Sequence, residues 1–292
     1  ITATATDATN NTSQFSRRVG VGEVINGIIT VNTTDDVDDG TADATHTSLR
    51  EAIHAANNHP GRDGIRFAIG SGTKTIAPLT PLPAILDSIV IDGWTQPGFA
   101  GTPIIEISGA QIEREKFNRP SATEFYMFAI NVMADNSTVR GLVINRFFEF
   151  LVSGGSVIRV GGSPLNIVGN SNVIEGNYIG TNVAGTSALG NLSPVAIVGS
   201  NIRIGGATAQ QRNLFDAARD SGFSVAGDAN VIQGNYIGTN AAGTAAIGNG
   251  RGDSDAANVF GNGNLIGGAA PGEGNLISGN LGDALDVFGP GN

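Results

Sequence analysis

One 20-residue phrase occurs twice in this chain, and it constrains the fold more than any other feature. Residues 172–191 read NVIEGNYIGTNVAGTSALGN and residues 230–249 read NVIQGNYIGTNAAGTAAIGN, so 16 of the 20 positions are identical. The second copy begins 58 residues after the first. Self-similarity at a fixed interval is typical of repeat architectures, in which each unit stacks on its neighbours. At this interval the unit is either one blade of a β-propeller or several coils of a solenoid.

Pairs of apolar residues distinguish these two architectures. They recur about every 17–24 residues, at Val173-Ile174, Ile197-Val198, Leu214-Phe215 and Val231-Ile232. This interval fits one coil of a parallel β-solenoid, and a 58-residue unit would then hold three coils. Strands this short would pair with the coils above and below. Over residues 64–292, about 11 coils rising about 4.8 Å each would span about 50 Å.

Glycine and asparagine fit a chain that turns often. Glycine is 43 of 292 residues, roughly twice the usual share. A hydrophobic content of 40% argues against disorder. Both residue types tolerate the left-handed backbone of tight corners, and stacked asparagines can hydrogen-bond along a ladder. We expect Asn172 with Asn230, and Asn177 with Asn235, to hold such ladder or corner positions.

A single helix is predicted near the front of the chain. Ser48 can cap it, and Glu51 three residues later completes a capping box. An apolar face follows at helical spacing, and Pro60-Gly61 lies just beyond the expected end. Because the first coil of a solenoid would otherwise expose edges and core, we interpret this helix as a cap.

The pattern divides the chain into three parts. Residues 1–18 read as a strand and linker from a preceding module, and residues 19–63 as a cap region with an acidic loop and the helix. Residues 64–292 are the predicted β-helix, with a polar loop protruding over 110–124. The final strand-like stretch, residues 286–292, carries no cap signal, so we expect an uncovered end.

Three phrases, in order along the chain, carry a family resemblance. Residues 47–53, TSLREAI, resemble the SLREAI signature of bacterial secreted right-handed β-helix repeat proteins. Residues 91–98, IDGWTQPG, and the GNYIGTN phrases at 176–191 and 234–249 are similar to other phrases of that family. The resemblance implies an all-β fold, a right-handed parallel β-helix, in an extracellular cell-surface protein. It implies little about chemistry.

Composition excludes several classes of function. With 26 acidic and 16 basic residues the net charge is −10, which argues against a nucleic-acid partner. Cysteine is absent, which excludes disulfides, thiolate metal sites and a cysteine nucleophile. No run of 18 apolar residues occurs, so no membrane span is expected.

The acidic loop is the strongest candidate for an ion site. Its five aspartates could supply oxygen ligands for calcium; they are Asp35, Asp36, Asp38, Asp39 and Asp43. A plain solvated loop is the alternative. The three histidines, at positions 46, 54 and 59, lack the spacing of a metal site.

A second candidate site would bind a sugar. Arg140, Arg146 and Arg159 could line one face and bind an acidic polysaccharide, and Trp94 could stack on a sugar ring or pack against the first coils. For hydrolysis the candidate carboxylates are the pairs Asp253/Asp255 and Asp283/Asp286.

The residues favour a structural function over an enzymatic one. No lysine or histidine follows residue 116, so a lyase would lack two of its usual bases. We predict a structural or adhesive extracellular rod, a segment of a larger surface or filament-forming protein. Its partners would be neighbouring modules or further copies joined end to end. The alternative is a polysaccharide lyase or hydrolase, or a glycan-binding β-helix.

Overall fold

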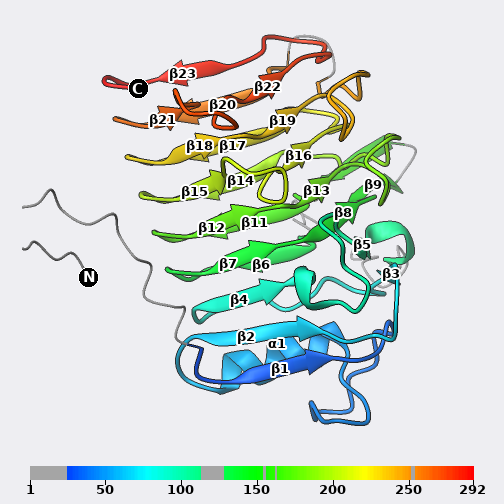
Figure 1. Ribbon diagram of the computed structural model, residues 1–292. Helices are drawn as coiled ribbons and strands as arrows, with labels where there is room; N and C mark the ends of the chain where they lie inside the picture. The colour runs from blue at the N-terminus through cyan, green and yellow to red at the C-terminus, as the bar shows by residue number, and fades with distance from the viewer. Residues whose placement is uncertain (1–24, 113–127, 154–155, 162, 251–253) are drawn as a thin grey trace, which may run out of the picture.

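The computed structural model describes residues 25–112, 128–153, 156–161, 163–250 and 254–292. Within these residues the protein is mostly β, with three parallel sheets and one α-helix, a fold like a parallel β-helix (Figure 1). The strand and linker predicted over residues 1–18 lie outside the described residues. Most of the loop predicted over 110–124 also lies outside them.

The strands of each sheet are stacked along one axis. The first sheet contains β1 (Ile28–Val31), β2 (Asp63–Phe67), β4 (Ile89–Asp92), β7 (Thr138–Arg140), β12 (Val173–Glu175), β15 (Arg203–Gly205), β18 (Val231–Gln233) and β21 (Leu265–Ile266). The second contains β3 (Lys74–Ile76), β5 (Ile105–Ser108), β8 (Leu142–Asn145), β13 (Tyr178–Ile179), β16 (Leu214–Phe215), β19 (Tyr236–Ile237) and β22 (Leu276–Ile277). The third contains β6 (Ile130–Val132), β11 (Leu165–Val168), β14 (Val195–Val198), β17 (Phe223–Ala226), β20 (Ala257–Phe260) and β23 (Asp286–Phe288).

From β4 onward the chain visits the first, second and third sheets in turn and then returns to the first. We call one such passage a coil. The register shows how many coils the sequence repeat spans, because Val173 pairs with Arg203 and Arg203 pairs with Val231. The 58-residue repeat therefore contains two coils, and the prediction of three was wrong.

The error came from treating neighbouring apolar pairs as neighbouring coils. Val173-Ile174 lies in the first sheet, Ile197-Val198 in the third and Leu214-Phe215 in the second. Each pair therefore lies two sides of the stack beyond the one before it, so the three intervals from Val173 to Val231 make two coils. The seven strands of the first sheet from β2 to β21 cover the region of the predicted β-helix, and they span about 29 Å instead of about 50 Å.

Inward side chains form the core because apolar residues at paired positions of successive strands lie directly on one another. In the first sheet one inward column runs through Ile65, Ile91, Val139, Ile174, Ile204, Ile232 and Ile266. All of these are buried except Ile266, which lies at the C-terminal end and is only partly buried. Each parallel strand thus covers the apolar residues of the strand below it.

Asparagines form a buried ladder at the corner between the first two sheets. Its members are Asn177, Asn213, Asn235 and Asn275. Each of the first three donates from Nδ2 to Oδ1 of the next, at 3.2, 2.9 and 3.1 Å. Asn177 and Asn235 therefore share a ladder, as predicted, with Asn213 between them.

Asn172 and Asn230 both lie at the corner before the first sheet, in one column, as predicted, but no amide lies between them. Ile202 occupies the rung between them, and its backbone N–H donates to Asn230 Oδ1 at 2.9 Å. Further along the same column two side-chain amides do bond directly, because Asn264 Nδ2 donates to Asn292 Oδ1 at 3.1 Å. A corner position in this fold therefore accepts an apolar residue as well as an amide.

Helix α1 (Leu49–Asn58) packs at the N-terminal end of the stack, against β1 and β2 (Figure 1). Ser48 and Glu51 form the predicted capping box. The predicted apolar face is buried and joins the core, through Leu49, Ala52, Ile53 and Ala56. The helix predicted from local sequence signals is thus confirmed in place and in its buried face.

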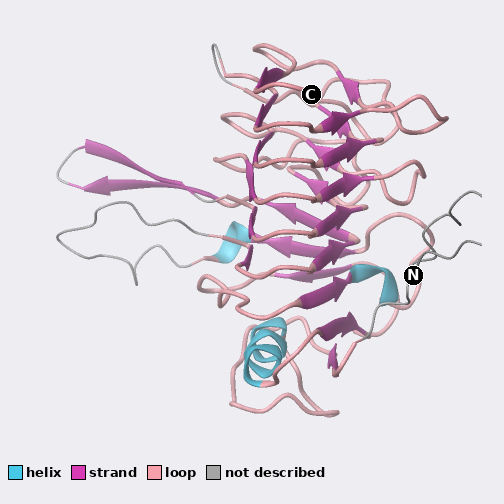
Figure 2. Ribbon diagram, turned by 90° about the vertical axis from the view of Figure 1, so that its left-hand side faces the viewer, coloured by secondary structure: helices cyan, strands magenta, loops and turns pink. Residues whose placement is uncertain are grey.

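An antiparallel hairpin of β9 (Phe148–Ser153) and β10 (Ser156–Gly161) projects from the stack (Figure 2). Two short 3₁₀ helices, η1 (Gly93–Thr95) and η2 (Gly109–Gln111), follow β4 and β5. Among the described residues no helix is long and apolar enough to cross a bilayer.

Candidate functional site

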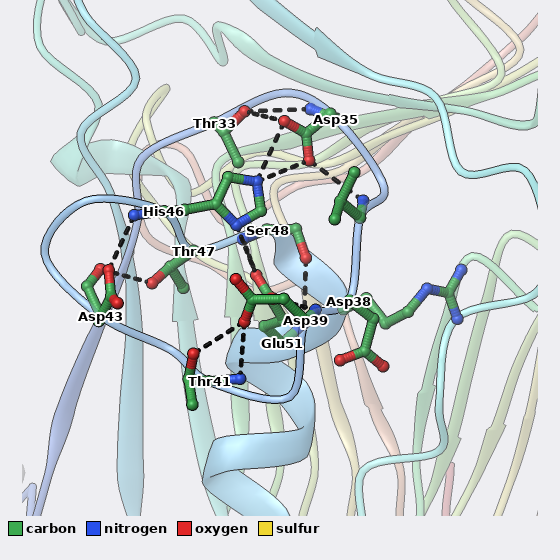
Figure 3. Close-up of polar contacts among 12 residues, drawn as sticks. Thr33, Asp35, Asp38, Asp39, Thr41, Asp43, His46, Thr47, Ser48 and Glu51 are labelled. Carbon is green, nitrogen blue, oxygen red and sulfur yellow. Dashed lines mark hydrogen bonds and ion pairs between the residues drawn. The ribbon is translucent and has the colours of Figure 1, made fainter.

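The acidic loop connects β1 to α1, and its aspartates mostly stabilise their own turns (Figure 3). Asp39 Oδ1 accepts hydrogen bonds from the backbone N–H and the hydroxyl of Thr41, at 3.0 and 2.8 Å. Asp43 Oδ1 accepts the same two bonds from Thr45. These hydrogen bonds lower the pKa of Asp39 and of Asp43, because they favour the ionised carboxylates.

Two further aspartates contact other parts of the molecule. Asp36 forms a bidentate pair with Arg50, at 3.0 and 2.8 Å, which ties the loop to α1. Asp38 lies 3.4 Å from Nε2 of His54 on the exposed side of the same helix. The five aspartates predicted as one calcium site therefore point to different partners, and each holds the loop in shape.

His46 connects the loop to the start of the helix. Its Nε2 lies 3.1 Å from Asp35 Oδ1, and its Nδ1 lies 3.2 Å from Glu51 Oε2 (Figure 3). Glu51 has a side chain only 1% exposed, and it accepts hydrogen bonds from the backbone N–H groups of Asp39 and Ser48, both at 2.8 Å. Although desolvation opposes it, the pKa of His46 is raised by Asp35 and Glu51.

This arrangement brings one predicted aspartate together with two residues that the calcium hypothesis left out. Ligand atoms of Asp39, His46 and Glu51 all lie within 4.8 Å of one another. An imidazole with two carboxylates is a donor set suited to first-row transition metals, whereas calcium takes six to eight oxygens. A pocket of about 310 Å³ adjoins the cluster, lined by Asp38, Gly40, Thr41, Ala42, Glu51, His54, Ala55 and Asn58.

The sequence carried one signal for this cluster. A capping box places the side chain of Glu51 back toward Ser48, and so toward the loop that precedes the helix. The position of His46 follows from the path of the loop, which no local pattern encodes.

The second candidate site contains Trp94 and Arg140, and the structure does bring these two together. The Arg140 guanidinium lies 4.7 Å from the centre of the Trp94 ring. Arg140 also bonds Asp92 at 2.7 Å and lies 3.7 Å from Glu175. These three charged residues are register partners on adjacent strands, so their charges alternate along the first sheet.

Trp94 lies against the corners of the next coils. A Cβ added to Gly141 would lie 2.4 Å from its ring, and one added to Gly176 would lie 3.0 Å from it. The ring also stacks near Phe99, with 6.1 Å between centroids. Of the two interpretations offered for this tryptophan, these contacts correspond to packing against the coils.

The other two arginines lie in parts of the fold away from the Trp94–Arg140 pair. Arg146 follows β8 of the second sheet, has φ 61°, and contacts Ser108 and Glu106 at 3.5 and 4.0 Å. Arg159 lies in β10 of the hairpin, where its side chain is outside the described residues. The three arginines are therefore distributed over two parallel sheets and the hairpin.

Three of the four candidate hydrolytic carboxylates lie close together in the structure. Asp255, Asp283 and Asp286 have carboxylate oxygens within 4.8 Å of one another at the C-terminal end of the stack, while Asp253 lies outside the described residues.

Comparisons of the chain with protein-family models, curated proteins and solved structures found no match.

Proposed function

We propose that this chain is a structural segment of an extracellular rod, a closed right-handed β-helix that serves as a stalk or filament module of a larger surface protein. The observation that carries the proposal is the stack of parallel strands itself, which α1 covers at its N-terminal end. The extracellular location and the handedness rest on the resemblance of residues 47–53, 91–98 and 176–191 to secreted β-helix proteins.

The N-terminal end of the stack is covered. The helix α1 packs against β1 and β2, and its buried face belongs to the same core as Val31, Ile65 and Phe67. The acidic loop is fixed to that helix through Arg50 and Glu51. An approaching molecule would therefore meet charged loop and helix at this end.

Within the described residues, the last strand of each sheet is paired with a neighbour on one side only. These strands are β21, β22 and β23. Val287 continues an inward column above Val225 and Val259, yet it is 41% exposed while those two are buried. Leu281 nearby is 69% exposed. Edge strands with bare apolar residues are templates for pairing with another chain.

We infer that the C-terminal coils join a further stack of strands, supplied by a neighbouring module of the same protein or by another copy joined end to end. In the isolated chain, that stack would be another copy. This contact pairs backbone groups of the edge strands and covers Ile277 and Val287. Since α1 closes the other end, two isolated copies would pair through their C-terminal coils, in an isologous arrangement. The product is a rod of twice the length.

The charged residues on the coils also support a structural role over catalysis. Glu175 accepts from Arg203 at 2.8 Å and from Gln211 at 3.1 Å, and it lies beside Arg140. Groups held in such a ladder fix the register of adjacent strands, as cross-strand pairs of opposite charge do.

Light scattering with negative-stain electron microscopy tests the proposal. We expect a mass that rises with concentration toward twice that of the 29.7 kDa chain, and rods joined at one end. Val287→Lys puts a charge into the contact and should keep the protein monomeric. Val37→Lys, at an exposed position of the acidic loop, is the matched control and should assemble as the wild type does. A wild type that stays monomeric at all concentrations contradicts the proposal.

A further inference from the structure

Three side chains at the N-terminal cap converge on one point. We call them the cap cluster; they are Asp39, His46 and Glu51, and one donor atom of each lies within 4.8 Å of the other two (Figure 3). Asp39 and His46 belong to the acidic loop, and Glu51 belongs to the first turn of α1. The fold of the loop back onto the helix thus brings one imidazole nitrogen beside two carboxylate oxygens.

Asp35 sets which ring nitrogen of His46 carries the hydrogen. Nε2 lies 3.1 and 3.2 Å from the two carboxylate oxygens of Asp35. An ionised carboxylate only accepts hydrogen bonds, so Nε2 holds the hydrogen and the neutral ring has its lone pair on Nδ1. Histidines that bind metals are oriented in this way, because the second ring nitrogen donates to a carboxylate.

Nδ1 of His46 is a buried nitrogen without a hydrogen-bond partner among the described residues. Glu51 Oε2 lies 3.2 Å from it, but the two atoms do not have the geometry of a hydrogen bond. With the ring hydrogen on Nε2, two lone pairs face each other here. A buried polar atom that lacks a partner costs free energy, so this pair of atoms points to a positive ion between them.

The separations within the cap cluster fit a small divalent ion. Zn²⁺ bonds nitrogen and carboxylate oxygen at about 2.0–2.2 Å, so two such ligands at an angle of about 100° lie about 3.2 Å apart. His46 Nδ1 and Glu51 Oε2 have this separation. Asp39 is exposed, so its carboxylate is free to approach. Because no two donor atoms are more than 4.8 Å apart, a movement of about 1.5 Å is enough.

Positive charge is scarce around these carboxylates. Glu51 is buried, and among the described residues its ion-pair partner is His46 alone. Asp35 pairs with the same imidazole. Asp36, in contrast, has Arg50 as its partner. A single imidazole, even when protonated, cannot balance Asp35, Asp39 and Glu51, whereas a divalent cation bound among them offsets most of their charge.

We propose that the cap cluster binds a divalent first-row transition-metal ion such as Zn²⁺, through Asp39, His46 Nδ1 and Glu51. An imidazole ligand favours such ions over Ca²⁺, which takes six to eight oxygens. The pocket beside the cluster is also lined by Glu51, so water from it can complete the coordination. The ion ties the acidic loop to α1, at the opposite end of the stack from the C-terminal contact, and stabilises the folded cap.

Two matched variants test the site by calorimetric titration of the untagged protein with Zn²⁺. Asp39→Asn removes the charge of one ligand but keeps Oδ1 for the hydrogen bonds from Thr41. Asp43→Asn makes the same change in a similar turn outside the cluster, where Thr45 is the donor. We expect the wild type to bind one Zn²⁺ and Asp39→Asn to bind it at least roughly tenfold more weakly. Asp43→Asn should stay within about twofold of the wild type.

Thermal unfolding gives a second measurement. Zn²⁺ should raise the unfolding temperature of the wild type and of Asp43→Asn more than that of Asp39→Asn, because it binds only the folded cap. His46→Gln should lose Zn²⁺ binding. Since His46 also holds the loop in place, the Asp39 and Asp43 variants decide the question if His46→Gln does not fold.

Three results would overturn the proposal. In the first, the wild type binds no Zn²⁺, and His46 is then only an ion-pair partner of Asp35 and Glu51. In the second, Asp39→Asn and Asp43→Asn bind Zn²⁺ equally well, so the ion is not held at the cap cluster. In the third, Ca²⁺ displaces Zn²⁺ at equal concentration, which would show attraction by the acidic loop as a whole and no nitrogen ligand.

Discussion

Asn213 donates a hydrogen bond from its Nδ2 to Oδ1 of Asn235, at 2.9 Å, one coil further along the stack. The same Nδ2 also donates to the backbone carbonyl of Ile174 on the preceding coil, at 2.9 Å. One fully buried amide thus joins three successive coils. A carboxylate of the same shape cannot do this, because it has no donor.

We therefore expect Asn213→Asp to destabilise the protein by about 3–5 kcal/mol, because it buries an acceptor against two other acceptors. Asn182→Asp is the matched control. Asn182 Oδ1 accepts from the backbone N–H groups of Thr186 and Ser187, a role that a carboxylate keeps. The control should change stability by less than about 0.5 kcal/mol. Chemical denaturation measures both; equal losses would show that the ladder amide does not bridge coils.

Asp216 gives the stack a dependence on pH. Its side chain is buried, Oδ1 accepts from the Gly238 N–H at 2.8 Å, and within the described part of the chain Oδ2 has no hydrogen-bond partner. Burial raises its pKa to about 8, against the opposing effect of the Gly238 and Thr239 N–H groups. The folded state therefore holds a proton that the unfolded chain releases above pH 4.

The contribution of Asp216 to stability should accordingly fall as the pH rises from about 4 through 8, by about 5–6 kcal/mol in all. Asp216→Asn removes this titration, so the variant should gain on the wild type progressively over that range. Asp220→Asn, at a half-buried loop position nearby, serves as the control and should follow the wild-type curve. Urea unfolding at a series of pH values measures the difference; a constant gap between Asp216→Asn and wild type would contradict a raised pKa.

Glycines at the corner after the third sheet allow the coils to approach closely. Gly227 has φ 145°, and a Cβ there would lie 2.0 Å from the Gly199 carbonyl oxygen. Gly267 also has a positive φ, 84°, but a Cβ there would meet nothing within 4 Å. We expect Gly227→Ala to cost about 3 kcal/mol or more and Gly267→Ala about 1 kcal/mol. Thermal unfolding of the two variants separates the cost of a clash between coils from the cost of backbone strain. Equal losses of stability in both would show that strain alone explains the effect.

Glu51 holds the N-terminal cap together through Ser48, Asp39 and His46. Glu51→Ala should lower the free energy of unfolding by about 2 kcal/mol and speed amide exchange in α1. His54→Ala, on the exposed side of the same helix, is the control, because its removal leaves the capping box intact. If amide exchange in α1 is unchanged in Glu51→Ala, the cluster does not fix the helix.

Local signals in the sequence predicted α1 well, because Ser48, Glu51 and the spacing of its apolar residues are all encoded within the helix. The number of coils was predicted badly. Strands as short as Tyr178–Ile179 are too short for a period of two to show, and an apolar pair does not reveal which sheet it joins. The 58-residue repeat was correct as a pattern, but its division into coils depends on pairing between distant strands.

In the candidate sites too, local features were predicted from the sequence, whereas contacts between distant residues were not. The aspartates of the loop were recognised, yet four of the five use at least one carboxylate oxygen in their own turns, as Asp43 does with Thr45. His46 meets Glu51 only because the loop folds back on the helix. Arg140 and Trp94 do meet, but the pairing of Arg140 with Asp92 could be found only from the strand register.

Hydrogen exchange at the C-terminal coil tests the central claim most directly. The claim is that β21, β22 and β23 form the contact between copies, so their outer backbone amides should exchange freely at low protein concentration. At high concentration we expect peptides containing β22 and β23 to exchange at least roughly tenfold more slowly, while β1 at the other end stays unchanged. Exchange in β22 and β23 that is the same at every concentration would contradict the claim, whatever the measured mass.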